Sequence, residues 1–123
     1  MTDQDPLTEK IIGCAIAVHR ELGPGLLESI YEAALCIEFE EASLKYHRQM
    51  VYPVTYKGRA IGEHRLDLVV EDTVVVEVKA VERFDSVFEA QILSYMGMTG
   101  KHVGLPINFN TRLLKDGIRR FVI

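Results

Sequence analysis

The apolar residues of the first forty positions recur every three or four residues, which is the spacing of amphipathic helices. Asp5 followed by Pro6 is a typical helix start, with an N-cap residue and then a proline in the first turn. The Gly-Pro-Gly run at 23–25 interrupts the pattern, because proline cannot continue a helix and glycine tolerates positive φ. The pattern therefore predicts two helices, over about residues 7–22 and 27–42.

The hydrophobic pattern changes to a period of two near residue 48. A proline at position 53 favours an edge strand or a bulge for the first strand of this region. The unbroken valines at 74–76 favour a third strand that is buried on both faces and therefore central. With turn signals between them, the predicted strands cover residues 48–56, 60–70 and 74–79.

The last third of the chain predicts one more helix and two more strands. Ser86 and Glu89 form a capping-box pattern, preceded by Asp85, and the helix is expected to end near Gly100. Pro106 is awkward inside the next strand, since it has no backbone N–H to donate. The helix is predicted over about 86–98 and the strands over 103–109 and 118–123, with a turn at 116–117. This order predicts an α/β fold in which helices pack on a mixed sheet.

Composition predicts a single globular domain over residues 1–123. Hydrophobic residues make up 48% and charged residues 26% of the chain, no apolar run approaches the ~18 residues of a spanning helix, and the acidic start is unlike a signal peptide. Two cysteines are too few for a disulfide scaffold, so we expect a cytoplasmic protein without membrane contact. The net charge of −4 means that a nucleic-acid partner would need a local basic patch or the help of metal ions.

The strongest candidate for chemistry is the hairpin closed by residues 71–73. This connection predicts that Asp67 stands directly opposite Glu77, and Lys79, two residues further on, shares their face. Like charges opposed in apolar surroundings are destabilising. Either a divalent cation bridges the two carboxylates, or Lys79 or Arg65 forms a local salt bridge with them. A hard cation such as Mg²⁺ suits two carboxylates on a rigid sheet.

Three motifs resemble those of a known family. Asp67 followed by Glu77-Val78-Lys79 resembles the Asp…Glu-x-Lys core of the PD-(D/E)XK nuclease superfamily. The heptapeptide from Gly25 to Tyr31 resembles the signature of the small GxxExxY proteins within it, and Gln91…Tyr95 resembles the Gln-x-x-x-Tyr element that follows the core in several branches. Position 66 is leucine where the superfamily name has proline, which is the loosest part of the pattern.

The resemblance implies a restriction-endonuclease-like fold and a nuclease that depends on Mg²⁺ or Mn²⁺. It implies that the catalytic set comprises Glu28, Asp67, Glu77, Lys79 and Gln91. Within this set Asp67 and Glu77 would hold the metal, with help from the Val78 carbonyl and from Glu28, directly or through water. Lys79 would serve the attacking water, Gln91 would support the site and Tyr95 would line it.

The residues around this core leave some assignments open. Glu28 lies at the margin of the apolar stripe of its helix and is turned toward the sheet. By the same geometry Glu38 is an alternative candidate for the site. The expected role of Glu38, however, is a salt bridge to a strand arginine. Arg65 shares the face of Asp67 and could contact a phosphate or pair with Glu77. Tyr31 is expected in the core.

The predicted function is phosphodiester hydrolysis in nucleic acid, with DNA as the expected substrate. Two alternatives stay open: a non-catalytic binding module on the same fold, and a metal-dependent hydrolase of a small phosphorylated molecule. The low positive charge motivates a further hypothesis, that a homodimer supplies the missing binding surface.

Overall fold

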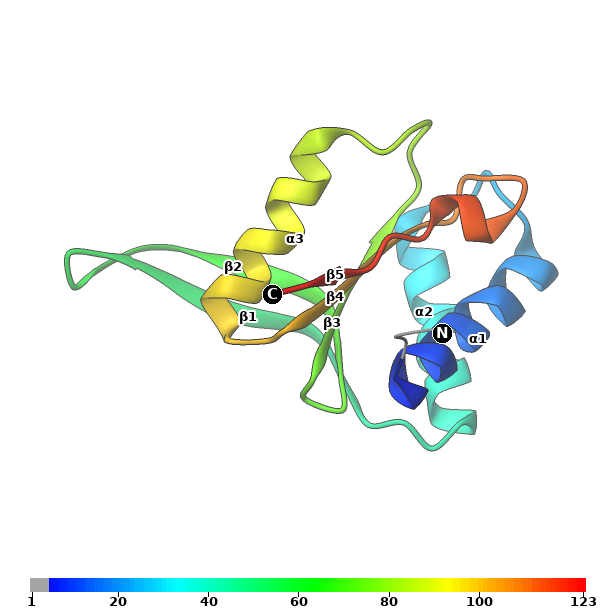
Figure 1. Ribbon diagram of the computed structural model, residues 1–123, viewed down its shortest axis with the longest axis horizontal. Helices are drawn as coiled ribbons and strands as arrows, with labels where there is room; N and C mark the ends of the chain where they lie inside the picture. The colour runs from blue at the N-terminus through cyan, green and yellow to red at the C-terminus, as the bar shows by residue number, and fades with distance from the viewer. Residues whose placement is uncertain (1–4) are drawn as a thin grey trace.

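The computed structural model describes residues 5–123 as a five-stranded mixed sheet, with α1 and α2 on one face and α3 on the other (Figure 1). This is the predicted α/β architecture and is consistent with a restriction-endonuclease-like fold. In chain order the elements are α1 (Pro6–Leu22), α2 (Glu28–Glu41), β1 (Tyr46–Tyr56), β2 (Arg59–Val70), β3 (Val74–Lys79), α3 (Ser86–Thr99), β4 (Val103–Asn108), the 3-10 helix η1 (Leu114–Gly117) and β5 (Phe121–Val122).

The sheet places its most hydrophobic strand in the centre. The strand order is β1-β2-β3-β4-β5, and only the β3–β4 pair is parallel. All of β3 except its last residue is buried, as its run of valines predicted. The β2–β3 hairpin has the predicted register, with Leu68 opposite Val76 and Val70 opposite Val74. β1 is an edge strand, which accommodates Pro53.

The helix starts depend on aspartate side chains. Asp5 caps α1 by accepting a hydrogen bond from the Thr8 N–H at 2.7 Å, and Pro6 occupies the first turn, as predicted. The capping box expected at Ser86 is wrong, because Asp85 is the N-cap of α3 and accepts a hydrogen bond from the Val87 N–H at 3.2 Å. A carboxylate at this position also interacts favourably with the positive end of the helix dipole.

The C-terminal segment differs from the prediction. Residues 114–117 form a 3-10 helix instead of a simple turn, and the last strand is only Phe121–Val122 instead of 118–123. Pro106 fits within β4 because its carbonyl accepts a hydrogen bond from the Arg119 N–H at 3.2 Å. The N–H and C=O groups of a strand residue point to the same side, so the missing N–H lies on the side of β5 and the pairing with β3 is intact.

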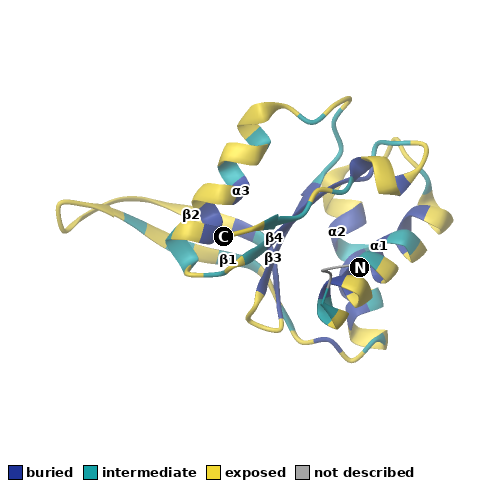
Figure 2. Ribbon diagram, in the orientation of Figure 1, coloured by how far each residue is buried: buried dark blue, intermediate teal, exposed yellow. Residues whose placement is uncertain are grey.

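Two buried clusters hold the layers together, one on each face of the sheet (Figure 2). The larger packs α1 and α2 on side chains such as Leu68 and Val76, and the smaller packs Ile92 and Met96 of α3 on side chains such as Leu66. Gly104 of β4 allows α3 to approach closely, since a Cβ there would lie 2.6 Å from the sulfur of Met96. This contact fixes α3, and with it Gln91, against the sheet.

Candidate active site

The site lies where β2 and β3 separate. The last backbone pair on this side of the hairpin is Leu68 with Val76, and beyond it side chains replace the ladder. Asp67 accepts a hydrogen bond from the Val78 N–H at 2.8 Å, and its own N–H donates to Glu77 at 3.1 Å. The direct cross-strand pair expected for Asp67 and Glu77 is therefore replaced by a fork, in which each carboxylate satisfies a backbone N–H of the opposite strand.

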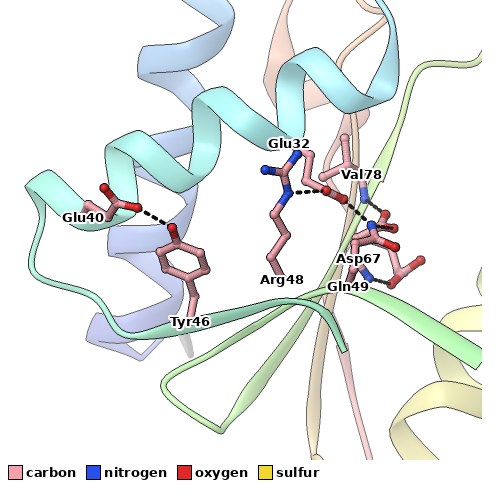
Figure 3. Close-up of polar contacts among 8 residues, drawn as sticks. Glu32, Glu40, Tyr46, Arg48, Gln49, Asp67 and Val78 are labelled. Carbon is pink, nitrogen blue, oxygen red and sulfur yellow. Dashed lines mark hydrogen bonds and ion pairs between the residues drawn. The ribbon is translucent and has the colours of Figure 1, made fainter. Parts of the chain in front are cut away.

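An irregularity in β1 lies beside this fork. Gln49 has a φ of 54°, a left-handed conformation that is uncommon for a residue with a side chain, and the β1–β2 pairing skips from Arg48–Leu68 to Met50–Leu66 at this point. The Gln49 side-chain amide donates hydrogen bonds to Asp67 at 3.3 Å and to Glu32 at 2.9 Å (Figure 3). An irregularity in one strand thus aims an amide at the carboxylate of the next strand.

Glu32 of α2 belongs to the site, although sequence reasoning did not select it. It is buried, and it forms an ion pair with Arg48 at 2.7 Å, so the strand arginine pairs with Glu32 and not with Glu38 (Figure 3). The hydrogen bond to Glu32 raises the pKa of Arg48. The signal that could have found Glu32 is its spacing, because residues four apart share one face of a helix and Glu32 follows Glu28 by four.

Glu28 contacts the chain just after β3. Its carboxylate accepts a hydrogen bond from the Ala80 N–H at 3.2 Å, so it turns toward the sheet as its place on the stripe predicted. Tyr31, one turn along α2, is fully buried and stacks on Phe109. A cleft of about 560 Å³ opens between the start of α2 and the fork, lined by Leu26, Leu27, Glu28, Ser29, Glu32, Gln49, Asp67 and Ala80.

Lys79, Gln91 and Tyr95 meet on the side of the sheet that α3 covers. The Lys79 ammonium donates a hydrogen bond to the Gln91 side chain at 3.3 Å and lies 4.7 Å from the centre of the Phe88 ring. Tyr95, one turn further along α3, is buried, and its ring lies 5.1 Å from that of His64. Burial, followed by the charges of Glu77 and Asp67, raises the pKa of Tyr95. The amine is thus held by a neutral amide and an aromatic face.

Of the two carboxylates at the fork, Glu77 is buried and Asp67 is half-buried, and the positive charge of Lys79 acts on both. Glu77 is 5% exposed, and within residues 5–123 neither Glu77 nor Asp67 forms an ion pair. Burial, reinforced by the neighbouring Asp67, raises the pKa of Glu77 to about 8. Burial also raises the pKa of Asp67, although the hydrogen bond from Val78 opposes this shift. Both groups are deprotonated only at a cost that a bound cation would offset.

This donor set fits a hard divalent cation. Two carboxylates that form no ion pair within the described residues, next to the backbone carbonyl of Val78, are oxygen ligands of the kind that Mg²⁺ and Mn²⁺ accept together with water. In the part of the chain from residue 5 onward, no three His, Cys, Asp or Glu side chains are grouped to hold a metal ion by themselves. Water or substrate oxygens would therefore have to complete the coordination shell.

Arg65 forms no hydrogen bond or ion pair with the other candidate residues in the described part of the chain. It is exposed on β2 opposite Val51, and the salt bridge to Glu77 considered from the sequence is not among the ion pairs of the described residues. Strand side chains alternate, so Arg65 lies on the same face as Asp67. That position leaves its guanidinium available to a ligand.

Comparison with protein families identifies the class. The chain belongs to the PD-(D/E)XK nuclease superfamily, whose sequence pattern it matches over residues 5–121. Nucleases of this superfamily generally use divalent metal ions and act on nucleic acid. Searches of curated proteins and of solved structures gave no match. Between residues 5 and 123, no helix combines the length and the apolar character needed to cross a bilayer.

Proposed function

We propose that this protein is a divalent-metal-dependent nuclease of the GxxExxY type that hydrolyses phosphodiester bonds in DNA. The observation that supports the proposal is the contact between half-buried Asp67 and buried Glu77 at the fork, beside Lys79 and without an ion pair among residues 5–123. The chain that carries them belongs to a nuclease superfamily. A purely structural carboxylate pair would be expected to have a cationic partner or to be exposed. Here neither carboxylate forms an ion pair among residues 5–123, and Glu77 is buried.

In the proposed mechanism Asp67 and Glu77 would hold Mg²⁺ or Mn²⁺, with help from the Val78 carbonyl. When bound, the ion would supply Lewis-acid stabilisation of charge on a phosphoryl oxygen and would make a nearby water more acidic. Glu28, which the Ala80 N–H orients at the wall of the cleft, completes the acidic shell directly or through water. The hydrogen bonds from Val78 and Gln49 keep the Asp67 carboxylate in one orientation.

Lys79 acts on the attacking water and on the charge that develops during the reaction. Hydrolysis forms a bond from the water oxygen to phosphorus, breaks the bond to the leaving oxygen, and transfers the proton of the water ultimately to the leaving group. An ammonium group can orient that water and stabilise the developing negative charge. Gln91 holds the Lys79 amine, Tyr95 lines the site beside it, and Arg65 contacts a neighbouring phosphate.

A cleavage assay with a matched pair of variants tests this function. Wild type, Asp67→Asn and Asp72→Asn are incubated with duplex DNA, single-stranded DNA and RNA, with Mg²⁺, Mn²⁺ or a chelator. Asp72 lies five residues away on the same hairpin, is exposed and pairs with Lys101, so the same substitution there serves as the control. We expect metal-dependent cleavage of DNA that Asp67→Asn abolishes and Asp72→Asn retains.

Thermal unfolding in the same metal ions separates this function from its alternatives. A cation that binds the native state alone must raise the melting temperature, and Asp67→Asn should remove this increase. No stabilisation at millimolar metal, together with no cleavage, would indicate a non-catalytic binding module. Stabilisation without cleavage of any nucleic acid, but with release of phosphate from small phosphate esters, would indicate the small-molecule hydrolase.

The same proposal includes a homodimer as the state that binds DNA, because the chain carries a net charge of −4. Gel filtration with light scattering at the concentration of the cleavage assay measures the mass directly. A monomer of 13.9 kDa that cleaves DNA at full rate would remove the dimer from the proposal and leave the hydrolysis untouched.

A further inference from the structure

The hairpin of β1 and β2 continues well beyond the sheet as a two-stranded arm, defined here as residues 51–65. β3 pairs with β2 only at residues 68–70, so the arm has no third strand, and Figure 1 shows it extending away from the helices. A two-stranded ribbon is marginally stable alone in water. Its length exceeds what the core of the protein requires.

The arm carries charge of the opposite sign to the rest of the chain. Lys57, Arg59 and Arg65 outnumber Glu63, which gives the arm a net charge of +2. The total of −4 therefore leaves −6 on all other residues. The C-terminal residues 112–120, with Arg112, Lys115, Arg119 and Arg120 against Asp116, carry a further net charge of +3. The arm is a net-positive element that projects from the sheet of an acidic protein, and such an element is expected of a surface that meets a phosphate backbone.

The tip of the arm is exposed and tightly turned. Lys57 and Gly58 both have positive φ, at 50° and 77°, which corresponds to the two-residue turn preferred by twisted hairpins. Tyr56 next to the turn is 61% exposed, and Lys57 lies over its ring at 5.5 Å. The tip thus presents an aromatic ring and cationic groups together on a rigid turn.

The arm is continuous with the candidate active site through β2. Arg59 precedes Asp67 by eight residues on the same strand, a separation of about 26 Å at ~3.3 Å per residue. This distance corresponds to about eight base pairs of B-form DNA at ~3.4 Å per step. Asp67 lines the cleft, and Arg65, two residues earlier on β2, is expected on the same face of the strand.

We propose that the arm is a duplex-DNA-binding element that contacts the phosphate backbone and a groove within about eight base pairs of the bond to be cleaved. This inference rests on the proposed function, which it deepens. The major groove of B-form DNA, about 12 Å wide, admits a two-stranded β-ribbon. The deep and narrow major groove of an RNA duplex does not admit such a ribbon, so the arm is expected to bind duplex DNA in preference to duplex RNA.

A second copy of the chain is a less favourable binding partner for the arm than duplex DNA. Edge-to-edge pairing would have to use β1, the free edge strand, and Pro53 removes a donor from that edge. Two arms in contact would also bring their positive charges together. Duplex DNA neutralises those charges.

Binding measured without hydrolysis tests the proposal. The fluorescence anisotropy of a labelled 24-base-pair DNA is titrated with wild type, Lys57→Gln/Arg59→Gln, or Lys10→Gln/Lys45→Gln, in a chelator so that no cleavage occurs. Lys10 and Lys45 are exposed and lie outside the arm, so the control pair removes the same charge elsewhere. Single Arg59→Gln is the second arm variant, and equal melting temperatures verify folding.

We expect the arm pair to weaken binding about tenfold and the control pair less than about twofold. Loss of two phosphate contacts should also lower the slope of log affinity against log salt by about 1.8. The proposal would be overturned if the arm and control double variants lost DNA affinity equally, or if wild type bound an RNA duplex as tightly as the DNA duplex. It would also be overturned if wild type did not bind DNA at low salt. A dimer that the arm variant dissociates would overturn it as well, by assigning the arm to a second copy.

The same measurements distinguish the proposed DNA-binding role of the arm from the proposed hydrolysis. Binding that depends on the arm, without cleavage in any metal ion, would support the arm and contradict the proposed hydrolysis. Cleavage that proceeds at equal DNA affinity in wild type and arm variant would support the hydrolysis and contradict the arm.

Discussion

The two halves of β2 lie in opposite environments. From Leu66 to Val70 the strand is largely buried between layers of helices, whereas from Arg59 to Arg65 it is exposed along its whole length (Figure 2). The buried half holds Asp67 in one orientation through hydrogen bonds from Val78 and Gln49. The exposed half has neither the packing nor the hydrogen bonds that would be needed to position a catalytic group. One strand therefore joins a rigid site to a projecting surface, and substitutions in its two halves should have different consequences.

The largest expected effect is on stability, in the buried half. Leu66 is fully buried and packs against α3, so Leu66→Ala should lower the free energy of unfolding by about 2–5 kcal/mol. Ile61, 65% exposed on the arm, is the matched aliphatic position, and Ile61→Ala should cost less than about 1 kcal/mol. Urea unfolding followed by circular dichroism measures both. Similar losses at the two positions would show that the arm is packed in solution.

The next effect is on the rate of cleavage. Lys79→Ala should lower the maximal rate by about 10²–10³-fold, because it removes a preorganised charge from the reacting centre. Lys45→Ala is the control, since this lysine is exposed and lies before β1. Single-turnover cleavage at saturating DNA reports the rate, and filter binding reports the affinity. A loss of DNA affinity with an unchanged cleavage rate would assign Lys79 a role in substrate binding instead of in the chemical step.

The third effect is a pH dependence of stability in the presence of a chelator. The pKa of Glu77 is raised to about 8 from an ordinary value of 4.5, so the folded state retains a proton that the unfolded state releases. This stabilisation is fully present below pH 4.5 and is lost as the pH rises through about 8. At about 1.4 kcal/mol per pKa unit, the total change is on the order of 5 kcal/mol. Unfolding measured across this range should show the decline.

Glu77→Gln should flatten that decline and make the metal-free protein more stable near pH 8, because a neutral amide replaces a buried charge. Glu63→Gln, on the exposed half of β2, is the matched control. If wild type and Glu77→Gln lose stability equally between pH 5 and pH 8, the fork does not bury an uncompensated carboxylate.

The smallest effect concerns Gln49. Gln49→Gly relieves the left-handed backbone but removes the amide that bridges Glu32 and Asp67, so stability should change by less than about 1 kcal/mol. Cleavage should nevertheless fall by about tenfold, because Asp67 loses one of the donors that orient it. Gln49→Asn, which tolerates the same φ and keeps an amide, should recover part of the rate. Full activity in Gln49→Gly would show that Asp67 is held by Val78 alone.

Most of the fold follows from local patterns. The change of period from helical to alternating, the Asp5 cap and the run of valines predicted three helices, four of the strands and the central position of β3. The C-terminal end was not predicted correctly, because η1 and β5 are short and β5 depends on pairing with β4. Short segments carry too little periodicity to reveal a pairing that only the assembled sheet creates.

The sequence by itself determined the chemistry of the site: two acids and one amine at the spacing of a hairpin, and a glutamine and a tyrosine on one helix face. The tertiary structure decided how these groups are held. The left-handed Gln49, the fork at Asp67 and the inclusion of Glu32 all depend on contacts between α2, β1 and β2, which are distant in sequence. A residue's chemical identity is local, but its burial, orientation and pKa depend on what surrounds it.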